Sequence, residues 1–127
     1  MASDMRIELI QVPVSDIDRA KAFYVDKVGF NADHDHQVSD ELRFVQLTPP
    51  GSACSIAFGY GFGEMSPGTL KALQVVVKDI EEAHADLAGR GVDVSPVDDQ
   101  AWGRFVHFAD PDGNTWSVQQ LPAWSAG

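Results

Sequence analysis

VSDIDRA at residues 14–20 and VKDIEEA at residues 77–83 are two copies of one pattern, V-x-D-I-[DE]-x-A. Their aspartates are separated by 79 − 16 = 63 residues, close to half of the 127-residue chain. Each copy follows an apolar, strand-like run and opens a stretch with the periodicity of a helix. A repeat at this spacing predicts two copies of one supersecondary unit.

Around the first copy, residues 6–14 alternate well enough to predict a strand that ends near Pro13. Ser15 and Asp18 fit a capping box at the start of a helix, and Gly29 is expected to end that helix. Shorter strands are expected at about 30–36, 42–48 and 54–60.

The second copy has the same order. A strand is expected over 70–77, a helix from Ile80, and strands at about 92–95, 104–109 and 115–121. DPDGN at 110–114 is typical of a tight hairpin turn. The prediction is therefore an α+β protein made of two βαβββ modules in one domain over 1–127, with module one at about 6–60 and module two at about 70–121.

The composition of the chain argues against several classes of binding partner. The formal net charge of −10 disfavours nucleic acid, and no apolar run is long enough to cross a bilayer. The single cysteine, Cys54, excludes an intrachain disulfide, and the first residues do not resemble a secretion signal. We therefore expect a cytoplasmic protein that binds neither nucleic acid nor membrane.

Several local motifs resemble those of a known protein family. PVSDIDRAKAFY at 13–24, KVGF at 27–30, WGR at 102–104 and FADPDGN at 108–114 resemble the vicinal oxygen chelate superfamily, the family of glyoxalases, bleomycin-resistance proteins and dioxygenases. The resemblance extends over about residues 6–121. It implies a curved mixed sheet around a central cavity, and a homodimer in which the cavities are completed across the interface.

Metal-using members of that family carry His, Gln or Glu at four inward-facing strand positions. By resemblance these positions are Leu9, Ala57, Leu73 and Ser117 in this chain. Leucine and alanine have no donor atom, and a serine hydroxyl is a poor anchor for a divalent cation. We therefore expect no metal and no cofactor.

If those four positions face the cavity, strand alternation adds their neighbours at i ± 2. By resemblance to fosfomycin-resistance proteins, His107 takes the place of a substrate-contacting tyrosine, and Phe105 shares its face. Trp102 could stack on a planar or cationic ligand or cap the core. The predicted ligand-binding residues are Leu9, Gln11, Ser55, Ala57, Leu73, Val75, Trp102, Phe105, His107, Ser117 and Gln119.

His107 is the candidate for acid–base chemistry, because imidazole titrates near physiological pH. His34 and His36 are expected on a solvated edge strand, and His84 and Cys54 are interpreted as packing residues.

We favour a metal-free protein that sequesters or carries a hydrophobic or planar small molecule, as bleomycin-resistance proteins do. The alternative is a metal-independent lyase or isomerase that uses His107 with Gln11, Ser117 or Gln119. A metal-dependent glyoxalase or dioxygenase is the third hypothesis, and it needs ligands that these positions do not supply.

Overall fold

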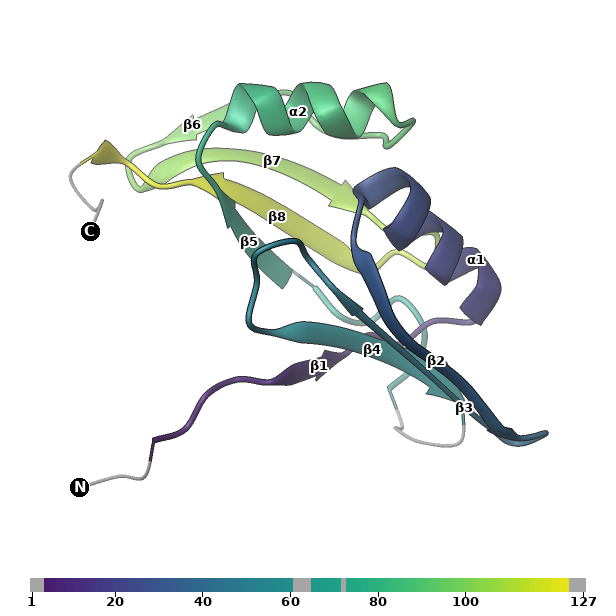
Figure 1. Cartoon of the computed structure of the whole chain (residues 1–127). Coiled ribbons are helices and arrows are strands. Elements are labelled where there is room, and N and C mark those ends of the chain that lie inside the picture. Colours follow the sequence, from purple (N-terminus) through teal and green to yellow (C-terminus); the bar gives the residue numbers. More distant parts are fainter. Residues whose placement is uncertain (1–3, 61–64, 72, 124–127) are drawn as a thin grey trace.

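The computed structural model describes residues 4–60, 65–71 and 73–123, and its strands form two four-stranded sheets (Figure 1). Sheet one has the order β1 (Leu9–Gln11), β4 (Ser55–Tyr60), β3 (Leu42–Thr48) and β2 (Asn31–Ser39). Sheet two has the order β5 (Leu73–Val77), β8 (Thr115–Gln120), β7 (Gly103–Ala109) and β6 (Asp98–Gln100). In each sheet the first strand is parallel to its neighbour and the other pairs are antiparallel. The predicted α+β fold of two βαβββ units is confirmed.

The repeated aspartate begins both helices. Asp16 Oδ1 accepts a hydrogen bond from the backbone N–H of Arg19 at 3.0 Å, at the start of α1 (Ile17–Ala22). Asp79 accepts bonds from the first turn of α2 (Ile80–Gly89) in the same way. An aspartate at this position satisfies backbone donors that the helix leaves unpaired. The predicted capping box at Ser15 is therefore wrong, since that hydroxyl donates to Asp112 instead.

The first helix continues past α1 as a π-helical segment, η1 (Phe23–Val28). Gly29 ends it with a φ of 92°, the left-handed conformation that glycine adopts without steric cost. This agrees with the end predicted from the sequence. No helix in the described part of the chain has the length and apolar character needed to cross a bilayer.

One strand prediction is wrong. Residues 92–95 form no strand, and the edge strand β6 begins only at Asp98. Val92 is buried and Val94 packs against the core, which explains the strand-like alternation. Ser95 still exchanges hydrogen bonds with the backbone of His107, but Pro96 has no N–H to continue the ladder.

The buried core lies between the two modules and is built from both. The Tyr24 ring from η1 packs against Phe30 and Phe58 of module one and Trp116 of module two, with ring centroids 5.7, 6.0 and 5.8 Å apart. α2 runs along the same side of sheet two (Figure 1). Each sheet therefore has a helix side that is packed into the core and an opposite face that no described helix covers.

A buried hydrogen-bond network joins the last hairpin to the first helix. The Asp110 side chain, 5 % exposed, accepts bonds from the Tyr24 hydroxyl at 2.7 Å and from the Asn114 amide at 2.8 Å. Its other oxygen accepts from the backbone N–H groups of Asp112 and Asn114. Four donors therefore converge on one carboxylate, which needs no cationic partner to be stabilised.

Further bonds extend this network. Trp116 Nε1 donates to the Tyr24 hydroxyl at 3.0 Å, and the Asn114 amide donates to the carbonyl of Pro13 at 2.8 Å. Burial, together with the adjacent Asp110 carboxylate, raises the pKa of Tyr24 well above its ordinary value. The phenol therefore stays protonated and remains a donor throughout the physiological pH range. The network ties the 110–114 turn to the connection between β1 and α1 and to η1.

Candidate functional site

The open face of sheet one carries the residues predicted there. The register pairs Leu9 with Ser55 and Gln11 with Ala57, so these four side chains share one face. β3 adds Gln46, which lies opposite Ala57. We call this surface the module-one face.

The open face of sheet two carries most of the remaining predicted residues. The register pairs Phe105 with Gln119 and His107 with Ser117. His107 Nδ1 lies 3.0 Å from Ser117 Oγ, and the rings of Phe105 and His107 are parallel within 5°. Gln119 donates to the carbonyl of Trp102 at 2.9 Å. This module-two face combines an aromatic ring with several hydrogen-bonding groups.

Two predicted residues, Leu73 and Val75, lie on the opposite side. β5 pairs Leu73 with Trp116 and Val75 with Val118, and both partners are buried on the helix side. Because strand side chains alternate, a register error of one residue moves every side chain to the other face.

Gln74 and Val76 take these places on the module-two face. The register pairs Gln74 with Ser117 and Val76 with Gln119, and the Gln74 amide donates to Gln119 Oε1. The run LQVVV at 73–77 hides the alternation, because three of its four apolar residues are consecutive valines. Its single polar residue, Gln74, is the one signal that marks the open face.

Trp102 lies in the turn before β7 and is 58 % exposed. Its carbonyl accepts a hydrogen bond from Gln119, which places the Trp102 backbone at the margin of the module-two face. The exposure argues against the core-capping role and leaves the ring free to stack on a ligand.

The donor atoms at these positions do not fit a metal ion. Leu9 and Ala57 contribute none, Ser117 contributes a hydroxyl, and the fourth place on the open face belongs to Gln74 rather than Leu73. Within residues 4–60, 65–71 and 73–123, no three His, Cys, Asp or Glu side chains are grouped closely enough to hold a metal.

His34 and His36 lie on the edge strand β2 and are exposed, as predicted. In the pairing of β2 with β3, His34 lies opposite Gln46 and His36 lies opposite Phe44. The two histidines therefore extend the module-one face. Their rings stack with centroids 5.6 Å apart. Sequence reasoning placed this pair on a solvated edge but missed its alignment with the predicted ligand-binding residues, because the pairing of β2 with β3 contains bulges.

Asp35, between these histidines, points to the helix side. Hydrogen bonds from Arg43 and Lys21 hold the pKa of its carboxyl well below the usual range. His84 and Cys54, interpreted as packing residues, are both half-buried.

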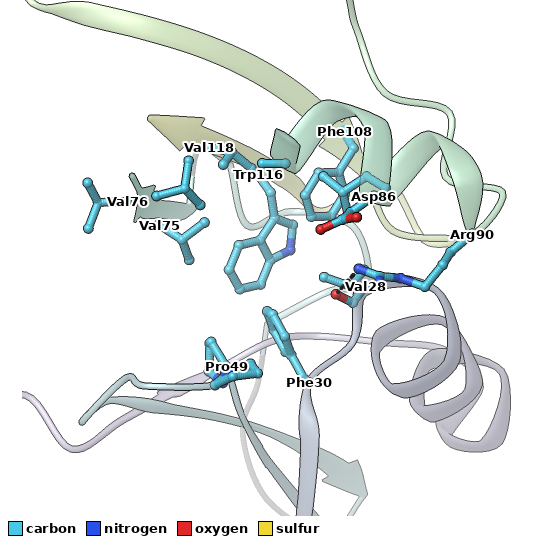
Figure 2. Close-up of a pocket in the computed structure, with 14 residues that line it drawn as sticks. Val28, Phe30, Pro49, Val75, Val76, Asp86, Arg90, Phe108, Trp116 and Val118 are labelled. Carbon is cyan, nitrogen blue, oxygen red and sulfur yellow. Dashed lines mark hydrogen bonds between the residues drawn. The ribbon is translucent and has the colours of Figure 1, made fainter. Parts of the chain in front are cut away.

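A separate groove of about 310 Å³ lies on the helix side, between α2, β5 and Pro49–Pro50 (Figure 2). The Trp116 indole occupies its centre, with Phe30 and Pro49 on one side of the ring and the β5 valines on another. Of the predicted ligand residues, Val75 alone lines it. Its lining comprises Val28, Phe30, Pro49, Pro50, Val75, Val76, Val77, Ala83, Asp86, Leu87, Arg90, Phe108, Trp116 and Val118.

Comparisons with known proteins agree with this architecture. The family model described as Glyoxalase/Bleomycin resistance protein/Dioxygenase superfamily matches residues 6–118. The structure of TnmS3, an antibiotic binding protein from Streptomyces sp. CB03234, is 36 % identical with a TM-score of 0.86, and the match covers 96 % of this chain and 100 % of that one.

Two further relatives are similar over most of their length. A glyoxalase/bleomycin resistance protein from the same Streptomyces strain is 38 % identical with a TM-score of 0.79, covering 91 % of this chain and 100 % of that one. The uncharacterized protein YetH of Bacillus subtilis (strain 168) is 27 % identical over 118 residues, which are 91 % of this chain and 98 % of YetH.

Proposed function

The chain belongs to the glyoxalase/bleomycin resistance protein/dioxygenase superfamily, and we propose that it sequesters or carries a small hydrophobic or planar molecule without using a metal ion. The observation that carries the proposal is the module-two face, where Phe105 lies beside His107, Ser117 and Gln119. Val76 and Trp102, 60 % and 58 % exposed, add apolar area to this face, and apolar area beside a few fixed hydrogen-bonding groups is the usual design of a small-molecule site. The similarity to TnmS3, which is described as antibiotic binding, supports the same reading.

The proposal is tested by calorimetric titration of a panel of planar aromatic antibiotics, with and without EDTA. We expect at least one compound to bind at micromolar or lower concentration, with the same affinity in both conditions. Affinity that disappears with EDTA and returns with a divalent metal would contradict a metal-free site. Saturable turnover of the bound compound would favour the enzymatic alternative below.

We further propose that the site is completed by a second copy of the chain. Both open faces end at a strand, β1 or β5, that has only one neighbour in its sheet. Apolar side chains gather near these edges: Met5 is 83 %, Ile7 71 % and Val76 60 % exposed. Pairing β1 of one copy with β5 of the other would satisfy the edge hydrogen bonds and join the module-one face to a module-two face. A two-fold dimer then has two identical clefts.

Val76→Lys is expected to weaken this dimer at least tenfold, because the change places a charge at the centre of the edge-to-edge contact. The matched control is Val38→Lys, since Val38 is 65 % exposed but lies on β2. Sedimentation velocity at several protein concentrations measures both. A wild-type protein that stays monomeric at tens of micromolar, or a Val76→Lys variant as dimeric as wild type, would contradict the proposed edge pairing.

The metal-independent enzyme remains a second candidate because of one contact, the 3.0 Å pair between His107 Nδ1 and Ser117 Oγ. Hydrogen bonding at Nδ1 orients the imidazole on the ligand face, so that the ring could exchange a proton with a bound molecule.

For an isomerase or lyase of this kind, His107→Ala should abolish turnover. Ser117→Ala, which removes only the orienting hydroxyl, is expected to lower the rate by about tenfold. His84→Ala serves as the control, because His84 lies on α2 away from both ligand faces. A rate unchanged in His107→Ala removes this residue from the mechanism.

A further inference from the structure

Buried aromatic rings support the helix-side groove from below, and Trp116 among them is only 2 % exposed. The Trp116 ring packs edge-on against Phe30, with centroids 5.6 Å apart, and lies parallel to Phe108 within 3°. Its indole nitrogen already donates to Tyr24, so it offers no free donor to a ligand. The other walls are mainly valine, leucine, alanine and proline. A preformed apolar surface of this kind selects the flat or aliphatic body of a ligand.

Two oppositely charged side chains, Arg90 and Asp86, line one end of the groove, and they differ in the partners that they already have. Arg90 Nε donates to the carbonyl of Lys27 at 2.7 Å and Nη2 to that of Val28 at 3.2 Å, at the end of η1 (Figure 2). The guanidinium is therefore committed to the carbonyl end of a helix, whose partial negative charge offsets its own.

Asp86 lies one helical turn before Arg90 on α2 and also lines the groove. Its carboxylate is exposed and has no ion pair among the described residues. The net charge of −10 adds a long-range field that attracts cations to this surface.

We propose that this groove is a second binding site, separate from the ligand faces, for a small organic cation. The aromatic or aliphatic body of the ligand lies against the accessible valine, alanine and proline side chains of the walls, and its ammonium group meets Asp86. A volume of about 310 Å³ limits the ligand to the size of a bicyclic amine. β5 lies between this site and the module-two face: Val75 and Val77 point to the helix side and Gln74 to the open face, and Val76 is the one residue of the module-two face that also lines the groove.

Three probes of similar shape and different charge test the proposal: naphthylmethylamine, naphthylmethanol and naphthylacetate. Calorimetry on the full chain should give the tightest binding for the amine and the weakest for the acetate. Asp86→Asn is expected to weaken the amine by about two- to fivefold and to leave the alcohol unchanged, because only the charge contact is lost. Asp93→Asn, which removes the same charge outside the groove, should change none of them.

The position of the binding site is tested by a substitution that fills the groove. Ala83→Leu adds volume to a half-buried lining residue without lowering helix propensity, and should weaken all three probes at least tenfold while a thermal melt shows that the fold is retained. Ser117→Phe, on the module-two face, should leave the three probes unaffected. The proposal is overturned if the wild-type protein binds none of them, if the acetate binds as well as the amine, or if Ser117→Phe rather than Ala83→Leu abolishes binding.

Discussion

Replacing Asp110 by alanine is expected to lower the free energy of unfolding by about 3–5 kcal/mol and the melting temperature by about 10 to 20 °C. The substitution leaves the Tyr24 hydroxyl, the Asn114 amide and two backbone N–H groups buried without their acceptor. Because small domains are stable by only about 5–15 kcal/mol, the variant should be close to unfolding at physiological temperature. Thermal and urea denaturation followed by circular dichroism measure both quantities.

Asp112→Ala is the matched control in the same turn. Its side chain is 7 % exposed, but its partners Ser15 and Arg19 are exposed and can turn to water when the carboxylate is removed, so we expect a loss of about 1–2 kcal/mol. An Asp110→Ala variant that melts within 2 °C (about the effect of a surface substitution) of the wild type would show that the buried network does not hold the two modules together.

Ser117→Phe is expected to weaken the ligand of the open faces by about a hundredfold, because the added ring occupies the space beside His107 and Gln74. Calorimetry with the compound selected by the antibiotic panel measures the change. Ser117 is half-buried at the surface of β8, so the ring extends away from the core and the fold is retained.

Two control variants are needed. One distinguishes the effect of the added ring from the loss of the Ser117 hydroxyl, and the other distinguishes the module-two face from the helix-side groove. Ser117→Ala removes the hydroxyl but keeps the space, and should change the affinity by no more than about fivefold. Ala83→Leu fills the helix-side groove and should leave this ligand unaffected. If Ser117→Phe binds the ligand as well as wild type does, the module-two face is not its site.

The features of the fold that follow from local chemistry could be predicted from the sequence. The aspartate of the repeated V-x-D-I motif begins both helices, and Gly29 ends the first, because unpaired backbone groups and positive φ angles favour these residue types. The alternation of β1, β4, β7 and β8 also placed eight predicted ligand residues on the open faces.

Features that depend on contacts between distant segments could not be predicted in the same way. The three consecutive valines of β5 conceal its register, so the sequence alone assigns Leu73 and Val75 to the wrong face, and only the pairing with β8 shows the correct one. The helix-side groove arises where α2, β5 and Pro49–Pro50 meet, and no local motif marks that meeting. The packing of the Tyr24 ring against rings of both modules likewise depends on how distant segments meet in the folded chain.

The most direct test of metal-free ligand binding is native mass spectrometry of the purified protein after exposure to nickel, zinc, manganese and iron, with and without the selected antibiotic. We expect a dimer mass with no stoichiometric metal, and one bound organic molecule per cleft when the compound is present. A dimer that retains one tightly bound metal ion per cleft, and that binds the compound only in this form, would contradict the account.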